Sequence, residues 1–248
     1  MTVTELEGAL QVIPVRGMPE VEEGADLAAL IAARADLVDR DVVVVAQKVV
    51  SKAEGRVVRL DEVEPSPLAR TIAGDHDPRQ LEVILRESAR IVRMRPPLVI
   101  AETRHGLVCA SAGVDASNAP EPGTVVLLPL DPDRSAASLR ARLAEVAGVE
   151  VAVLVSDSFG RPWRQGTTDV AIGLSGLQAL LDLHGERDPS GYELHATAIA
   201  VADEVAGAAQ LVMGKLDRIP AAVVRGLAHG SSGSARDLVM PAERDLFR

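Results

Sequence analysis

The chain has 248 residues, which is enough for one large domain or two small ones with a full hydrophobic core. Acidic residues outnumber basic ones by 36 to 26, and the net charge of −10 excludes a nucleic-acid scaffold, which needs a cationic face. The composition, 47% hydrophobic and 25% charged, is that of a folded protein. The single cysteine, Cys109, excludes an internal disulfide, and no signal sequence or bilayer-length apolar run is recognisable. We therefore expect a cytoplasmic protein with neither membrane nor nucleic-acid partners.

Short apolar runs alternate with helical periods along the chain, which predicts a mixed α and β protein. We expect, in chain order, a strand at 10–15, a helix capped by Asp26, strands at 41–47 and 55–59, a helix from Pro78 to Val92 closed by Pro96 and Pro97, strands at 98–101, 106–111 and 124–128, a helix from Ser135, a strand at 151–155, a helix within 197–213 and a strand at 221–224. Several strands follow one another without a helix between them, so a doubly wound parallel sheet is disfavoured. The prediction is an α+β fold with mixed or antiparallel sheets and flanking helices, in a single unit over residues 1–248.

Lysine and asparagine are unusually rare in this sequence. Only three of the 26 basic residues are lysines, Lys48, Lys52 and Lys215, and Asn118 is the single asparagine. Lysine is a compact point charge, and the planar fork of arginine cannot replace it in a tight phosphate site. Each remaining lysine is therefore a candidate phosphate ligand, although chance survival on the surface is the alternative.

The common nucleotide and metal signatures are absent. Gly214 and Lys215 resemble a phosphate-binding loop, but Leu216 stands where such a loop requires Ser or Thr. The five histidines show no metal-ligand spacing. Any nucleotide site must therefore be built in another way.

Two polar segments are candidates for such a site. Segment 112–118 follows a predicted strand and sets Asp115 beside flexible backbone, where it could bind a hard cation such as Mg²⁺; an Asx turn in a surface loop is the alternative. In segment 156–166, Asp157 ends the apolar strand at 151–155 and is followed by Arg161 and Arg164. Two guanidinium groups beside a carboxylate suit a polyanion and its metal, and a structural ion pair under an aromatic lid is the alternative.

A third candidate segment, 47–56, connects two predicted strands. We interpret it as a loop or strand end that carries Lys48, Ser51 and Lys52, because binding residues are often placed in such connections. If Lys52 faces the same pocket as the other two segments, it is the point charge for a phosphate. All three lysines and the single asparagine then fall in candidate site segments.

Taken together, the sequence resembles the coenzyme F420-0:L-glutamate ligases, the F420 gamma-glutamyl ligase family, which add glutamate to a deazaflavin cofactor. The matching stretches follow one another over nearly the whole chain: Gly17 to Glu20, Ala46 to Arg56, Thr103 to Gly106, Ala112 to Asn118, Ser156 to Gly166, Ala202 to Glu204, and Met213 to Lys215. This resemblance implies a family-specific fold of two intertwined lobes and a homodimer. It also implies that the chain is either a stand-alone ligase or the ligase part of a longer protein with a flavin domain.

The resemblance further implies a GTP-dependent ligase with two divalent ions, Mg²⁺ or Mn²⁺, and K⁺ as a candidate further cation. The residues expected to hold GTP are Met18, Pro19, Glu20, Val21, Gln47, Lys52, Asn118, Gly214 and Lys215. Those expected to hold metal are Asp115, Asp157 and Ser158, where Ser158 replaces the family's usual Thr but keeps a hydroxyl. Arg161 is the candidate catalytic residue. Ser111 replaces an Asn that is often seen in the family, so the resemblance does not predict the hydrogen bonds around this position.

The implied reaction joins L-glutamate to coenzyme F420-0, with possible further extension of the gamma-glutamyl tail. The substrate carboxylate would attack the γ-phosphate of GTP, and the glutamate amine would displace phosphate from the acyl phosphate. Such phosphoryl transfer depends mostly on positioning and charge neutralisation. Two alternatives are a nucleotide-binding regulator without turnover and a ligase of the same chemistry that acts on another acid.

Overall fold

The computed structural model describes residues 9–230 and 232–246 and has the predicted α+β fold with mixed and antiparallel sheets. Its strands and α-helices are, in chain order, β1 (Gln11–Pro14), α1 (Leu27–Ala32), β2 (Val42–Ala46), α2 (Gln47–Ala53), β3 (Val57–Arg59), α3 (Pro67–Ala73), α4 (Pro78–Glu87), β4 (Ser88–Arg95), β5 (Leu98–Thr103), β6 (Val108–Ala110), β7 (Thr124–Val126), α5 (Pro132–Ala147), β8 (Ala152–Gly160), β9 (Thr167–Ser175), β10 (Leu181–Asp182), β11 (Ala198–Ile199), α6 (Val201–Met213) and β12 (Ala221–Arg225). Among the described residues, no helix combines the length and the apolar character that a membrane span requires.

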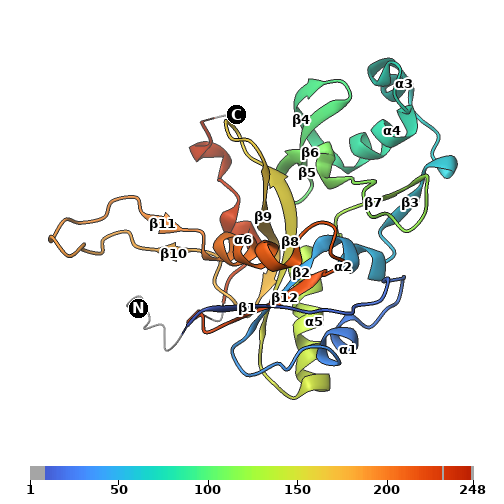
Figure 1. Cartoon of the computed structure of the whole chain (residues 1–248). Coiled ribbons are helices and arrows are strands. Elements are labelled where there is room, and N and C mark those ends of the chain that lie inside the picture. Colours follow the sequence, from blue (N-terminus) through green and yellow to red (C-terminus); the bar gives the residue numbers. More distant parts are fainter. Residues whose placement is uncertain (1–8, 231, 247–248) are drawn as a thin grey trace.

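The main sheet has five strands in the order β1-β12-β2-β8-β9 (Figure 1). β2 and β8 are parallel, whereas the other neighbouring strands in this sheet are antiparallel. The run Val42–Val45 of β2 is completely buried, as expected for a central strand that is covered on both faces. The carboxyl ends of β2 and β8 therefore open at the same edge of the sheet.

Helices cover both faces of the main sheet (Figure 1). On one face, α1 and α5 pack against odd-numbered residues of the central strands, such as Val43 and Val153. On the other face, α6 packs against even-numbered residues, such as Val44 and Leu154. This alternation follows from the two-residue period of a strand and gives the central strands an apolar layer on each face, and the two layers together form the core of the main sheet.

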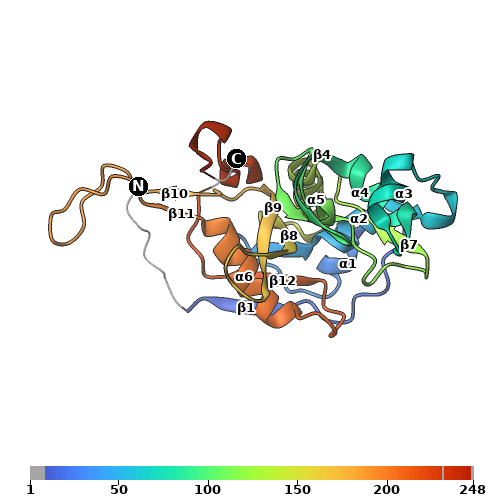
Figure 2. The same cartoon turned by 90° about the horizontal axis from the view of Figure 1, so that it is seen from above.

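A second core lies beside the main sheet. It is formed by α3, α4, the antiparallel pair β3-β7 and the three-stranded sheet β4-β5-β6, with Leu81, Ile84, Val99 and Val125 at its centre. Figure 2 shows α3 and α4 at one end of the molecule and the two-stranded arm β10-β11 at the other. The arm carries the exposed Tyr192 and extends away from the main sheet (Figure 1).

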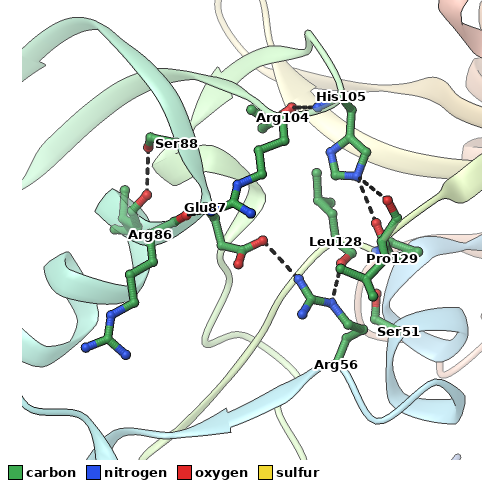
Figure 3. A network of polar contacts seen from close by, with 12 residues as sticks. Ser51, Arg56, Arg86, Glu87, Ser88, Arg104, His105, Leu128 and Pro129 are labelled. Atoms are coloured by element: carbon green, nitrogen blue, oxygen red, sulfur yellow. Dashed lines mark hydrogen bonds and ion pairs between the residues drawn. The ribbon is translucent and has the colours of Figure 1, made fainter.

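A polar network joins the two cores (Figure 3). Arg56, which follows α2, donates to the carbonyl of Leu128 at 3.0 Å and forms an ion pair of 2.9 Å with Glu87 at the end of α4. His105 lies between β5 and β6, and its Nε2 faces the carbonyl of Pro129 at 2.9 Å. These contacts tie α4 and the β5-β6 turn to the segment that leads from β7 to α5.

Two predicted elements are wrong because long-range contacts decide them. Residues 47–53, interpreted as a loop, form helix α2, which buries Val50 in the core of the main sheet. The helix predicted from Pro78 to Val92 begins at Pro78 but ends at Glu87. From Ser88 onward the chain is strand β4, because its backbone pairs with β5 and Arg90 forms an ion pair with Glu102. Helical spacing alone does not reveal such a pairing.

Several strand ends differ from the prediction by one or two residues, and the larger differences in boundaries are at α5, α6 and β8. α5 begins at Pro132, with Asp131 as its N-cap, and not at Ser135. α6 occupies only 201–213 of the predicted range. β8 does not end before Asp157 but continues to Gly160, because β9, a strand that sequence reasoning did not assign, pairs with it along its whole second half.

Candidate active site

A cavity of about 530 Å³ lies at the carboxyl ends of the parallel strands β2 and β8. In α/β sheets this edge is a usual place for ligand sites. Its walls come from the loop after β1, the start of α2, the segment 118–120, the second half of β8 and the connection from α6 to β12. The cavity is thus assembled from segments that are far apart in the sequence.

All nine residues predicted to hold GTP line this cavity: Met18, Pro19, Glu20, Val21, Gln47, Lys52, Asn118, Gly214 and Lys215. Asn118 has a φ of 56°, in the left-handed region that asparagine tolerates better than most residues. This backbone requirement is a structural reason for the single asparagine, in addition to its predicted ligand role. The structure brings the nine residues together, and their binding roles remain predictions.

Gln47 has an unsatisfied polar atom beside the cavity. Its side chain is buried, and Oε1 accepts a hydrogen bond of 2.9 Å from the Ser51 hydroxyl. The Nε2 amide group has no hydrogen-bond partner among the residues that the structure describes. Leaving a buried donor unpaired costs about 1–3 kcal/mol, so this group fits a polar ligand in the cavity.

Lys52 lies in the last turn of α2 and contributes a buried ammonium group. Its side chain is 7% exposed, and Nζ forms an ion pair of 2.5 Å with Glu20, which is 67% exposed on the loop after β1. The two predicted GTP ligands therefore bind each other in the structure. Because the carboxylate is the exposed partner, a phosphate group could take its place at Nζ.

Besides Glu20, the carboxylates of Asp157 on β8 and Asp169 on β9 line the cavity, and a third, Asp115, contacts the cavity-lining Lys48. Asp157 follows the last residue of the β2-β8 ladder, in which Ala46 pairs with Ser156. Asp169 of β9 lies opposite Ser158 and accepts hydrogen bonds from the hydroxyls of Ser156 at 3.1 Å and Ser158 at 2.6 Å. Sequence reasoning missed Asp169. Its signal was an acidic residue inside the strand-like, β-branched stretch 167–175.

The surroundings of Asp157 oppose its ionisation. Burial is the main cause that raises the pKa of Asp157 to about 7, and the nearby carboxylates of Asp169 and Asp115 raise it further. The Ser158 amide and the Lys48 ammonium act in the opposite direction. A bound cation would stabilise the ionised form of a carboxylate in such acidic surroundings.

Asp115, the third carboxylate, is held by a backbone bridge with Val126 and by the ammonium of Lys48 at 2.6 Å. Burial by itself would raise the pKa of Asp115. The hydrogen bonds from Lys48 and Ser117 outweigh it, so the pKa lies below its ordinary value. Asp115 is therefore ionised at neutral pH.

The comparison with known proteins assigns this arrangement to a family. The profile described as F420-0:Gamma-glutamyl ligase matches residues 17–226, which cover most of the chain and include all the cavity walls. The chain belongs to the F420-0:gamma-glutamyl ligase family. The resemblance stated from the sequence is thereby confirmed.

Individual members of the F420-0:gamma-glutamyl ligase family match nearly end to end. The chain is 50% identical over 247 residues to the coenzyme F420:L-glutamate ligase of Methanopyrus kandleri, covering 96% of this chain and 98% of that protein. The ligases of the same name from Methanothermobacter thermautotrophicus and Archaeoglobus fulgidus are 45% and 43% identical. Each match covers 96% of this chain, and 99% and 96% of the two relatives, respectively.

The residues predicted to hold metal in this family member fit a hard cation by chemistry. Asp115, Asp157 and Ser158 offer carboxylate and hydroxyl oxygens, the ligands that Mg²⁺ and Mn²⁺ prefer. Among residues 9–230 and 232–246, no three His, Cys, Asp or Glu side chains are close enough to form a metal site unaided. A metal here would need oxygens from the ligand or from water in addition.

The candidate catalytic residue Arg161 lies apart from the other predicted site residues. It is exposed in the connection between β8 and β9, where it donates to the carbonyl of Gln165 at 3.3 Å, and it is not part of the cavity wall. The sequence places Arg161 four residues after Asp157, but β8 continues to Gly160, so Arg161 lies beyond the end of the strand and away from the cavity.

Proposed function

We propose that the protein is a GTP-dependent ligase that adds L-glutamate to coenzyme F420-0. One observation carries this proposal: in a member of the F420-0:gamma-glutamyl ligase family, one cavity gathers three lysines, an unpaired buried amide and the carboxylates of Glu20, Asp157 and Asp169, with Asp115 bound to the cavity-lining Lys48. Cationic side chains suit the phosphates of a nucleotide, and carboxylates suit its divalent cation. The relatives named above are coenzyme F420:L-glutamate ligases.

In the proposed reaction, a carboxylate oxygen of F420-0 attacks the γ-phosphorus of GTP, and GDP leaves. The glutamate nitrogen then attacks the acyl carbon of the resulting acyl phosphate, inorganic phosphate leaves, and the nitrogen loses a proton as the amide forms. Lys52 and Lys215 bind and orient the phosphates, and Gln47 donates its free amide hydrogen to the nucleotide. These side chains act by positioning and by neutralising charge.

The proposed cofactor is Mg²⁺ or Mn²⁺, which Asp115, Asp157 and Ser158 would hold. When bound, such an ion supplies positive charge that polarises the transferred phosphoryl group. Asp169 accepts the hydroxyl hydrogens of Ser156 and Ser158, so it orients the Ser158 oxygen. Asp169 is thus a positioning residue for the predicted ligand.

Asp157→Asn is expected to lower turnover at least about a hundredfold while the melting temperature stays near that of the parent. The amide keeps the shape of the side chain but lacks the charge of a hard ligand. The assay combines F420-0, glutamate, GTP and Mn²⁺ and follows the mass of the product, which gains one glutamate per turnover. Glu204→Gln, a change at an exposed residue of α6, is the control.

No mass gain with the parent protein under these conditions would contradict the proposed function. GTP binding without phosphate release would instead favour a nucleotide-binding regulator. Amide formation only with a different acid would favour the related ligase. A parent-like rate for Asp157→Asn at low Mn²⁺ concentration would remove Asp157 from the metal site.

We also propose that two lobes, one around each core, pair with those of a second copy in an intertwined homodimer. The support is the β10-β11 arm, which extends from the main sheet and carries Tyr192 at 62% exposure (Figure 2). A two-stranded ribbon is marginally stable by itself in water, and contact with a second chain would stabilise it.

A further inference from the structure

Lys48 holds a fully coordinated ammonium group at the edge of the cavity. Its side chain is 14% exposed, and Nζ lies 2.6 Å from Asp115 Oδ2. The same group donates to the carbonyl of Ser117 at 2.9 Å and to the Ser117 hydroxyl at 2.6 Å. An ammonium has three hydrogens, so these three acceptors use its full capacity.

The Asp115 carboxylate already accepts three donors, two of them at Oδ2. Its Oδ1 accepts the Ser117 amide at 2.6 Å, and its Oδ2 accepts both the Ser117 hydroxyl at 3.0 Å and the Lys48 ammonium. A divalent cation and an ammonium cannot share the same oxygen without strong repulsion. A metal ion that uses Asp115 Oδ2 must therefore displace Lys48.

The cavity can accept the Lys48 ammonium when a metal ion displaces it from Asp115. It lines the 530 Å³ cavity together with Lys52 and Lys215, and its flexible stem lets the ammonium swing from the carboxylate into the cavity. An anionic group in that cavity would receive the freed ammonium. The Lys48 ammonium can thus pair either with the Asp115 carboxylate or with an anionic ligand in the cavity.

We propose that Lys48 is a resident cation that competes with the divalent metal for Asp115 and moves to a phosphate of the bound nucleotide when the metal enters. This inference rests on the metal role of Asp115 in the proposed function. In the metal-free protein, Lys48 balances one of the negative charges of Asp115, Asp157 and Asp169. In the loaded protein, it adds to the charge that faces the phosphates.

The alternative is that Lys48 is a structural tie between α2 and segment 115–117. Both readings expect a loss of stability when Lys48 is replaced, so the melting temperature of the metal-free protein does not separate them. The affinity for the metal separates the two interpretations. Removing a competing cation strengthens metal binding, whereas removing a structural tie leaves it unchanged or weakens it.

The experiment titrates Mn²⁺ into the nucleotide-free protein by calorimetry, with no substrate present. Lys48→Met and Lys48→Gln are expected to bind Mn²⁺ at least about tenfold more tightly than the parent, since each removes a positive charge beside Asp115. Lys48→Arg keeps the charge and should bind no more tightly than the parent. The matched control is Arg70→Met, which removes the cation of the exposed ion pair between Arg70 and Glu64.

A second readout is the rise in melting temperature on addition of Mn²⁺, which should be larger in Lys48→Met and Lys48→Gln than in the parent. The Gln variant can still donate a hydrogen bond to the Ser117 carbonyl, and it replaces the Met variant in the titration if the Met variant folds poorly. Equal or weaker Mn²⁺ binding by both neutral variants would overturn the proposal. Glutamate ligation by the parent is measured separately, so the failure of this inference and the failure of the proposed function give different results.

Discussion

At the scale of single residues, rare amino acids stand where their chemistry suits the position. Asn118 adopts the left-handed conformation, and Lys48 meets three oxygen acceptors with one small ammonium. Lys52 is buried against Glu20, where a guanidinium would need more space. The prediction that scarce residues mark the site therefore has a geometric basis for each of the three.

Lys52→Arg is expected to raise the KM for GTP at least about fivefold, although it conserves the charge, because the broad guanidinium does not fit the buried position of Nζ. Lys52→Ala should raise it further, since phosphate charge then stays uncompensated. The measurement is the KM for GTP at fixed salt, with the KM for glutamate as the internal control. Equal KM values for GTP in all three proteins would remove Lys52 from the site.

Glu82 gives a prediction about stability and pH. Hydrogen bonds from the Ser66 hydroxyl and amide and from Arg86 lower the pKa of this buried carboxyl to about 2. Because the folded-state pKa lies below the unfolded value of about 4.5, its stabilising effect is complete above pH 4.5 and is lost as the pH falls toward 2.

Glu82→Gln should therefore lower the free energy of unfolding by about 1–3 kcal/mol at pH 7. The difference from the parent should shrink between pH 4.5 and pH 3. Denaturant titrations at pH 7, 4.5 and 3 measure it, and Glu64→Gln, at an exposed ion pair, is the control with little effect. A difference that stays constant with pH would show that Glu82 acts through its shape and not its charge.

At the scale of elements, helix α6 fixes the edge strand β9. Asp203 Oδ1 accepts the amide hydrogen of Ala171 at 2.8 Å, and Gln210 Oε1 accepts that of Asp169 at 3.1 Å. The pairing of β8 with β9 shifts register between Val155 and Ser156, so the contacts from α6 secure the residues on the site side of this irregularity. The direction of the Asp169 carboxylate thus depends on a helix more than 30 residues later in the chain.

Asp203→Ala is expected to destabilise the protein by about 1–3 kcal/mol, because it leaves the buried Ala171 amide unpaired. It should also lower kcat with little effect on the KM for GTP, since Asp169 loses its orientation. Asp203→Asn keeps an oxygen acceptor and should restore both stability and kcat, whereas Glu204→Ala on the exposed face of α6 should change neither. Loss of stability in Asp203→Ala without a change in kcat would contradict a positioning role.

At the scale of the whole molecule, the segments that carry the predicted site residues converge from both cores. Asp115 lies in a segment beside the second core, and Asp157 lies on the main sheet. The Arg56–Glu87 ion pair and the His105 contact join the two parts (Figure 3). The arm at the opposite end of the molecule takes part in neither core.

The proposed dimer is tested on this arm. Sedimentation equilibrium of the whole chain should give twice the chain mass at tens of micromolar. Replacing residues 184–196 by an Asn-Gly turn removes the arm tip, including Tyr192, and should give a monomer with an unchanged fold by circular dichroism. A monomeric parent, or a shortened chain that remains dimeric, would contradict the proposed role of the arm.

The sequence by itself determined the α+β class, most of the elements, the family and the segments that line the cavity. These features depend on local periodicity, on caps such as Asp26 and on residue types that are read position by position. Only the tertiary structure decided that residues 47–53 form a helix, that the chain changes from helix to strand at Ser88, and that Asp169 lies opposite Ser158. These three outcomes depend on pairing and packing between distant segments, and such contacts leave no local pattern in the sequence.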